Sequence, residues 1–320
     1  MKRVLPSLIA VSVFAVIFRH FNFPYLIRLL GQSRWPLFGC AVILGSFLLP
    51  FFRAKRFESL MSSLPGAHSE IKLKDMVSIT MATRALNLVL PGRAGETLRT
   101  MKITRRFGYP FKSVIAAVLT ESGLEVITLT LMGSFIFSLG YFKSARHQLI
   151  YPMWGGAAIW LSLPLIARLN WSRLKTPQWI EEMKQAFHIL SHFKTWARAI
   201  FWTFCGDFVD MAMVGLCLSA VGLSRSFPAW VLTLVVINIA IMIPTPANLG
   251  TLEAGAVIAL GFLDIPREQA LAFALIYHSA HVIPVLIIGC ASLRAEFSTS
   301  SPVVIKSQSF KSLSLTPPPL

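Results

Sequence analysis

The stretch that decides the fold reads "NLVLPGRAGETLRT" and spans residues 87–100. An apolar segment runs into Pro91 and Gly92, and the charged residues Arg93 and Glu96 follow where apolar side chains should continue. Proline removes a hydrogen-bond donor from a helix and glycine frees the backbone, so the pair predicts a helix break. Inside a membrane, such a break is tolerated only where it packs in protein or lines a wet cavity.

The composition places this break in a membrane protein. The chain has 320 residues, of which 55% are hydrophobic and only 14% are charged, whereas a soluble domain averages about 25% charged residues. A spanning helix needs roughly 20 apolar residues. We predict an all-α polytopic membrane protein with about six full spans. The predicted spans are Val4–Phe18, Trp35–Phe52, Ser113–Leu139, Tyr151–Ala167, Ile200–Gly222 and Ala270–Leu293.

The positions of the basic residues predict the topology. Lys and Arg concentrate on the cytoplasmic side of membrane proteins, and the loop after the second predicted span carries Arg53, Lys55 and Arg56. If Asp75–Leu90 crossed the membrane, the basic segment at residues 93–112 would lie outside. We therefore predict that Asp75–Leu90 enters the membrane and turns back at Pro91-Gly92. Both chain termini are then cytoplasmic. The net charge of +16 becomes a topology signal, so we expect no nucleic-acid partner.

A second broken segment follows the fifth predicted span. Two short apolar arms, Trp230–Ile243 and Leu252–Leu263, flank a break that contains Pro244, Pro246 and Gly250. The arms predict a second re-entrant hairpin that enters from the opposite side. Both breaks share a pattern: an Asn before the break, a Gly four residues after a Pro, and a Glu in the first turn of the next half-helix. These residues are Asn87, Pro91, Gly95 and Glu96 in the first break, and Asn238, Pro246, Gly250 and Glu253 in the second.

This pattern is typical of an inverted-topology repeat, in which interrupted segments of the two halves mark the binding site. The start of a half-helix offers unpaired N–H groups and a partial positive charge. With Arg93 and Arg99 close to one such start, the first hairpin is predicted to receive a phosphate. Glu96 and Glu253 either bind a cationic headgroup or only cap their helices and pair with a nearby arginine.

Other polar residues lie inside the predicted spans. Glu121 and Glu125 are four residues apart, so they share a helix face. Intramembrane charge usually faces a cavity or a partner. Glu121 is therefore a candidate cavity residue, or the partner of an arginine such as Arg84. His278 and His281 have no evident third ligand, so we expect polar packing against the opposite hairpin rather than a metal site. No cofactor motif is present.

Three motifs carry a resemblance to a known family. "NLVLPGRAGETLR" at 87–99, "VLTESGLEVITL" at 118–129 and "IPTPANLGTLEAGAV" at 243–257 resemble the membrane domain of lysylphosphatidylglycerol synthases, which also occurs alone in flippase-like proteins. The resemblance implies lipid translocation, with aminoacyl transfer in a separate soluble domain for which this chain has no counterpart after Leu293. It implies site roles for Asn87, Arg93, Glu96, Arg99, Glu121 and Glu253. Ser122, Glu125 and His278 depart from the family's usual residues and leave the headgroup charge open.

We therefore expect a flippase-like membrane domain at residues 1–294 and a disordered cytoplasmic tail at 295–320. We expect the protein to move a phospholipid or a lipid-linked precursor across a bacterial inner membrane, and we do not expect it to be an enzyme. The expected ligand is a membrane lipid with an anionic or zwitterionic headgroup. The alternative is a non-catalytic membrane partner of a lipid-modifying or glycosyl-transfer enzyme. Metals and cofactors are not expected, and the sequence leaves the oligomeric state open.

Overall fold

The computed structural model describes residues 22–64, 71–89, 94–168, 187, 192–223, 225–243 and 245–298. Within these ranges the regular elements are all helices, which confirms the predicted all-α class. The elements of the first half are α2 Phe23–Gly31, α3 Trp35–Ile43, η1 Leu44–Leu48, α4 Leu49–Met61, α5 Leu73–Val89, α6 Ala94–Phe107, α7 Phe111–Ser138 and α8 Lys143–Arg168. Those of the second half are α10 Phe193–Ala220, α11 Phe227–Ala240, η2 Pro246–Asn248, α12 Thr251–Gly261, α13 Arg267–Pro284, η3 Val285–Gly289 and α14 Cys290–Ser298.

Four continuous helical segments of the described chain are long and apolar enough to cross a membrane. They are Trp35–Met61, Phe111–Ser138, Phe193–Ala220 and Arg267–Arg294, and they coincide with four of the six predicted spans. The fifth, predicted at Tyr151–Ala167, lies within α8, which has 26 residues and is therefore about 39 Å long. The predicted span Val4–Phe18 lies outside the described residues. The chain is thus a multi-pass membrane protein.

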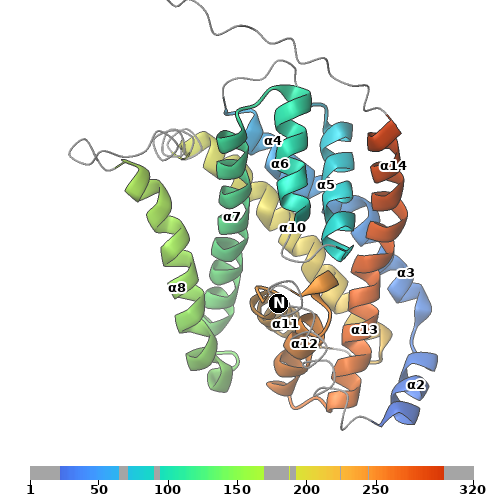
Figure 1. The fold of residues 1–320 in the computed structure, drawn as a ribbon. Coiled ribbons are helices and arrows are strands. Elements are labelled where there is room, and N and C mark those ends of the chain that lie inside the picture. The colour runs from blue at the N-terminus through green and yellow to red at the C-terminus, as the bar shows by residue number, and fades with distance from the viewer. Residues whose placement is uncertain are drawn as a thin grey trace, which may run out of the picture.

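The two predicted hairpins are pairs of short, packed helices. Helix α5 packs against α6, and α11 packs against α12. The four arms have 17, 14, 14 and 11 residues, so the longest is about 26 Å, shorter than the roughly 30 Å hydrocarbon core of a bilayer. Figure 1 shows α5 and α6 in the upper half of the bundle and α11 and α12 in the lower half, with their broken ends facing the middle.

Each hairpin is surrounded by its own hydrophobic core. The first hairpin packs with α4 and α7 around Phe57, Met76, Ile79 and Ile103, all of which are fully or almost fully buried. The second packs with α10 and α13 in a larger cluster of α3, α7, α10, α11, α12 and α13 residues. Large apolar side chains such as Phe47, Phe135 and Tyr151 are exposed on the outside of the bundle, as expected of a surface in contact with lipid.

The second span is longer than predicted. We expected it to end at Phe52 and placed Arg53, Lys55 and Arg56 in a cytoplasmic loop, but α4 continues to Met61. A five-residue π-helical turn, η1, joins α3 to α4 without a break. It lies just before Pro50, which cannot donate a backbone hydrogen bond. The helix therefore carries Arg53 and Arg56 into the bundle.

Three smaller differences concern the connecting segments. The loop predicted after the first span contains the helix α2. The basic segment that follows Pro91-Gly92 is the returning arm α6, and only Arg105 and Arg106 lie in its last turn. Helix α14 continues to Ser298, four residues into the predicted tail, and residues 299–320 lie outside the described part of the chain.

The hairpin topology predicts the side from which each loop can be labelled. In a variant whose four native cysteines are alanine, single cysteines at Lys72 and Arg105 should react with an impermeant maleimide from the same side of the membrane. Cysteines at Arg225 and Arg267 should react only from the other side, because α7, α8 and α10 cross between them. Labelling of positions 72 and 105 from different sides would refute the first hairpin.

Candidate functional site

A polar cavity of about 250 Å³ lies between the two broken hairpin ends. Its walls come from α4, α5, α6, α7, α10, α11, the second hairpin break and the last span. In the described part of the chain, four guanidinium and four carboxylate groups line it, namely Arg53, Arg56, Arg84, Arg99, Glu96, Glu121, Glu125 and Asp210.

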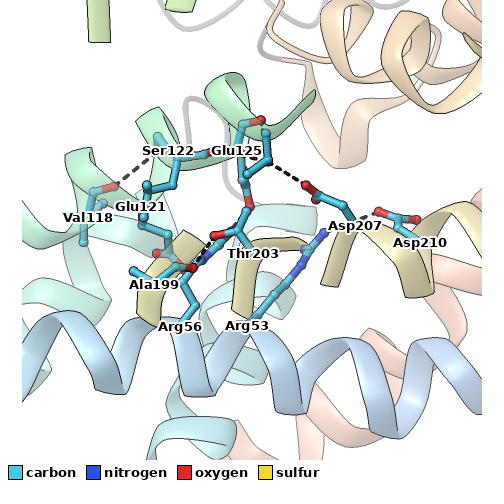
Figure 2. A network of polar contacts seen from close by, with 12 residues as sticks. Arg53, Arg56, Val118, Glu121, Ser122, Glu125, Ala199, Thr203, Asp207 and Asp210 are labelled. Carbon is cyan, nitrogen blue, oxygen red and sulfur yellow. Dashed lines mark hydrogen bonds and ion pairs between the residues drawn. The ribbon is translucent and has the colours of Figure 1, made fainter. Parts of the chain in front are cut away.

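Arg56 joins α4 to two carboxylates of α7. Its Nη2 donates to Glu121 Oε1 at 2.7 Å and to Glu125 Oε1 at 2.8 Å, and its Nε donates to Glu121 Oε1 at 3.2 Å. Figure 2 shows Arg53 and Arg56 projecting from α4 toward the acidic residues of α7 and α10. The spacing of four residues between Glu121 and Glu125 places both on the α7 face that meets α4.

Arg99 binds Glu121 from the opposite side. Its Nη2 donates to Glu121 Oε2, and its Nη1 lies 3.3 Å from Glu96 Oε2. The guanidinium carbon also lies 3.7 Å from the centre of the Phe57 ring, in a cation–π contact. Glu121 therefore accepts hydrogen bonds from guanidinium groups of α4 and α6, and its partners are Arg56 and Arg99 rather than Arg84.

Asp210 forms a second polar cluster with the last span. Its Oδ1 accepts from the Tyr277 hydroxyl at 2.6 Å and lies 3.0 Å from His281 Nε2. Its Oδ2 lies 3.6 Å from Arg53 Nη2. Asp207, one helical turn earlier, accepts from the Thr128 hydroxyl at 2.6 Å. The cluster connects α4, α10 and α13.

The break of the second hairpin is held by Glu253 and His278. Glu253 Oε2 accepts from the Gly250 N–H at 2.7 Å, and Glu253 Oε1 lies 2.6 Å from His278 Nδ1. His278 Nε2 lies 3.0 Å from the carbonyl oxygen of Ala247. Ala247 and Asn248 have φ angles of 52° and 58°, a region that non-glycine residues rarely adopt. His278 of α13 contacts this turn at Ala247 and so stabilises it.

The break of the first hairpin is closed differently. Asn87 Oδ1 accepts from the Gly95 N–H at 2.8 Å, which ties the end of α5 to the start of α6. A Cβ atom on Gly95 would lie 2.4 Å from the Thr83 carbonyl oxygen and 2.5 Å from Asn87 Oδ1. The glycine is therefore required for this close approach. Asn238, its counterpart in the predicted repeat, donates to Leu234 O within its own helix at 2.9 Å, so the repeat does not extend to this hydrogen bond.

The structure brings four of the six predicted binding residues to the cavity: Asn87, Glu96, Arg99 and Glu121. Glu253 is not among the lining residues and is only 1% exposed. Its contacts assign it to the second break. Arg93 lies outside the described residues, as do Pro91, Gly92 and Pro244. Of the remaining predicted break residues, Pro246 lies in η2, Gly95 is the second residue of α6, and Gly250 precedes α12 with a φ of 80°.

Sequence reasoning missed the lining residues Arg53, Arg56 and Tyr277. Arg53 and Arg56 are three residues apart directly after an apolar run. That spacing puts both on one helix face if the helix continues, and it was the signal that could have found them.

Comparison with protein families gives one match. The family model described as the lysylphosphatidylglycerol synthase TM region matches residues 3–289. No curated protein matches the chain.

The two glutamates of α7 should differ in their effect on stability. Glu121 is 8% exposed, and Glu121→Gln leaves two buried guanidinium groups without their shared carboxylate, a change that costs about 3–5 kcal/mol. Glu125 has a side chain that is 39% exposed, so Glu125→Gln should cost about 1 kcal/mol or less. Unfolding of the purified protein in detergent measures both, and an equal loss would contradict the central place of Glu121.

The Asn87–Gly95 closure predicts a selective effect of an added methyl group. Gly95→Ala should destabilise the protein by about 2 kcal/mol, because the methyl group displaces the Asn87 side chain. Gly155→Ala on α8 is the matched control, since a Cβ atom there meets nothing within 4 Å. Melting temperatures in detergent compare the two. A Gly95→Ala protein as stable as the control would contradict the close approach.

Proposed function

The chain belongs to the family of the lysylphosphatidylglycerol synthase TM region, and from this membership and the cavity we propose that it moves a membrane lipid between leaflets. The substrate is a phospholipid or a lipid-linked precursor. The observation that carries the proposal is a charged cavity of about 250 Å³ between two re-entrant hairpins. Intramembrane charges of this kind mark substrate pathways.

The charged lining of the cavity supports a division of the lipid between two environments. Walls that carry this many charged groups suit a polar headgroup, whereas two acyl chains are better solvated by the bilayer. The headgroup would pass through the cavity while the acyl chains stay in the bilayer. Arg99, which the sequence predicted as a phosphate ligand, is already bound to Glu121 and Glu96. In the proposal, Arg99 shapes the cavity, and the headgroup binds other donors.

The hairpins supply the means of access. They enter from opposite ends of the bundle, so each end is closed by one hairpin and its core (Figure 1). Rocking of one half against the other would open the cavity to each leaflet in turn. The lipid leaves chemically unchanged in this scheme. We place the protein in a bacterial inner membrane, with both termini in the cytoplasm.

A block of the cavity tests the proposal. In proteoliposomes with fluorescent phospholipids, the wild-type protein should move lipid at least about tenfold faster than protein-free vesicles, a barrier lowered by about 1.4 kcal/mol. Ser122 lines the cavity, and its hydroxyl donates only to Val118 O of its own helix. Ser122→Trp should abolish the movement by filling the space.

The matched control is Ser138→Trp, at an exposed position near the other end of the same helix. It should move lipid like the wild type. Melting temperatures show whether each variant is folded, and Glu96→Gln provides a second cavity variant with little change in volume. Equal lipid movement by wild type, Ser122→Trp and Glu96→Gln would refute the proposal. A cellular phenotype that survives both cavity substitutions would favour a partner of a lipid-modifying enzyme.

A further inference from the structure

One face of α5 offers hydrogen-bond donors to the cavity that no protein group uses. Thr80, Arg84 and Asn87 are spaced at i, i+4 and i+7, so they lie on the same side of the helix. All three line the cavity. Thr80 is 5% exposed, and its hydroxyl has no hydrogen-bond partner. Buried hydroxyl groups are almost always bonded, so the unused Thr80 hydroxyl beside the cavity is a candidate donor to a ligand or a water.

Arg84 is the cation of this face, and it has no ion-pair partner in the described part of the chain. Among the described residues it has no ion pair within 4.0 Å and no hydrogen bond, whereas Arg53, Arg56 and Arg99 each have a carboxylate within that distance. Asn87 has used its carbonyl oxygen on Gly95, which leaves its NH₂ group for the cavity. The face therefore presents a guanidinium, an amide NH₂ and a hydroxyl, which suits a phosphate.

The opposite wall offers an acceptor. Glu125 engages only Oε1, with Arg56, and its side chain is 39% exposed. Within the described residues, Oε2 of Glu125 has no hydrogen-bond partner. An ammonium group placed between Oε2 and the cavity would satisfy this carboxylate, since an ammonium carries three donors.

The charge balance selects between ligand classes. Among the described lining residues, the arginine, glutamate and aspartate groups are four cations and four anions, so their formal sum is zero. An anionic ligand would bind Arg84 but leave the cavity with an uncompensated negative charge. A ligand with one negative and one positive group satisfies both Arg84 and Glu125 and keeps the sum at zero, which matters because uncompensated charge is costly inside a membrane.

We propose that the headgroup carried by this cavity is zwitterionic, with its phosphodiester on Thr80, Arg84 and Asn87 and its primary amine on Glu125. The inference rests on the proposed function and specifies its substrate class as a phosphoethanolamine-type lipid. Arg84 recognises the phosphate that all phospholipids share. Glu125 distinguishes an amine-bearing headgroup from a neutral alcohol.

Lipid movement tests the selectivity. Proteoliposomes carry either phosphatidylethanolamine or phosphatidylglycerol with a fluorescent acyl chain, so that the headgroups are unmodified. The wild-type protein should move phosphatidylethanolamine about tenfold faster than phosphatidylglycerol, the size of one charge-assisted hydrogen bond. Glu125→Gln should bring the two rates together, and Arg84→Gln should slow both about tenfold. The matched controls Glu268→Gln and Arg267→Gln, which do not line the cavity, should behave like the wild type.

A binding measurement separates the lipid headgroup from free phosphate. Titration calorimetry on the purified protein in detergent uses glycerophosphoethanolamine, glycerophosphoglycerol and inorganic phosphate. Glycerophosphoethanolamine should bind about tenfold more tightly than the other two, and Arg84→Gln should lose this binding. Inorganic phosphate that binds as tightly as glycerophosphoethanolamine would overturn the inference.

The outcomes keep the two proposals apart. Equal movement of both lipids by the wild type overturns the zwitterionic selectivity and leaves the lipid-moving function intact. If no lipid moves, the function fails, and the calorimetry then decides whether the face of α5 is a headgroup site. Unfolding of Arg84→Gln in detergent is checked first, and Arg84→Lys, which keeps the charge, should retain part of the binding if the phosphate is recognised there.

Discussion

Glu121 accepts hydrogen bonds from Arg56 and Arg99 while only 8% of its surface is exposed. A charge at this depth in a membrane protein is costly unless it is paired, and removal of one member of a buried pair costs more than the pair itself contributes. The three side chains come from α4, α6 and α7. Each helix must therefore be in register with the other two, and this requirement fixes how the first hairpin sits against the two spans beside it.

The network also decides which charges remain for a ligand. Arg56 and Arg99 have carboxylate partners from the protein, so their charges shape the cavity without leaving a free cation there. Arg53 faces Asp210 in the second polar cluster. Within the described ranges, the groups that remain are Arg84 and the second carboxylate oxygen of Glu125. The unused groups, rather than the total number of charged side chains, therefore determine which ligand chemistry the cavity suits.

Much of the fold could be predicted from the sequence. Pro246, Gly250 and the basic residues located the breaks, because helix breakers and charge act locally and are visible along the chain. The pairing of Glu121 was not predictable in the same way. It depends on α4 continuing past Pro50, which a π-helical turn makes possible, and a proline in a sequence indicates an end at least as often as a continuation. The resemblance to the family found Glu121 and Arg99, but not that they pair, and it did not find Arg56.

The two breaks are closed by different means, and the difference has a mechanical consequence. Asn87 bonds Gly95 within the first hairpin, so its two arms are tied to each other at the tip. The tip of the second hairpin is instead tied to the last span through His278, which contacts both Glu253 and Ala247. The first hairpin is also held to α4 and α7 through Glu121, so it moves only together with those two helices. The second hairpin cannot tilt without moving α13, to which His278 ties it. A movement of either hairpin therefore displaces a different set of spans.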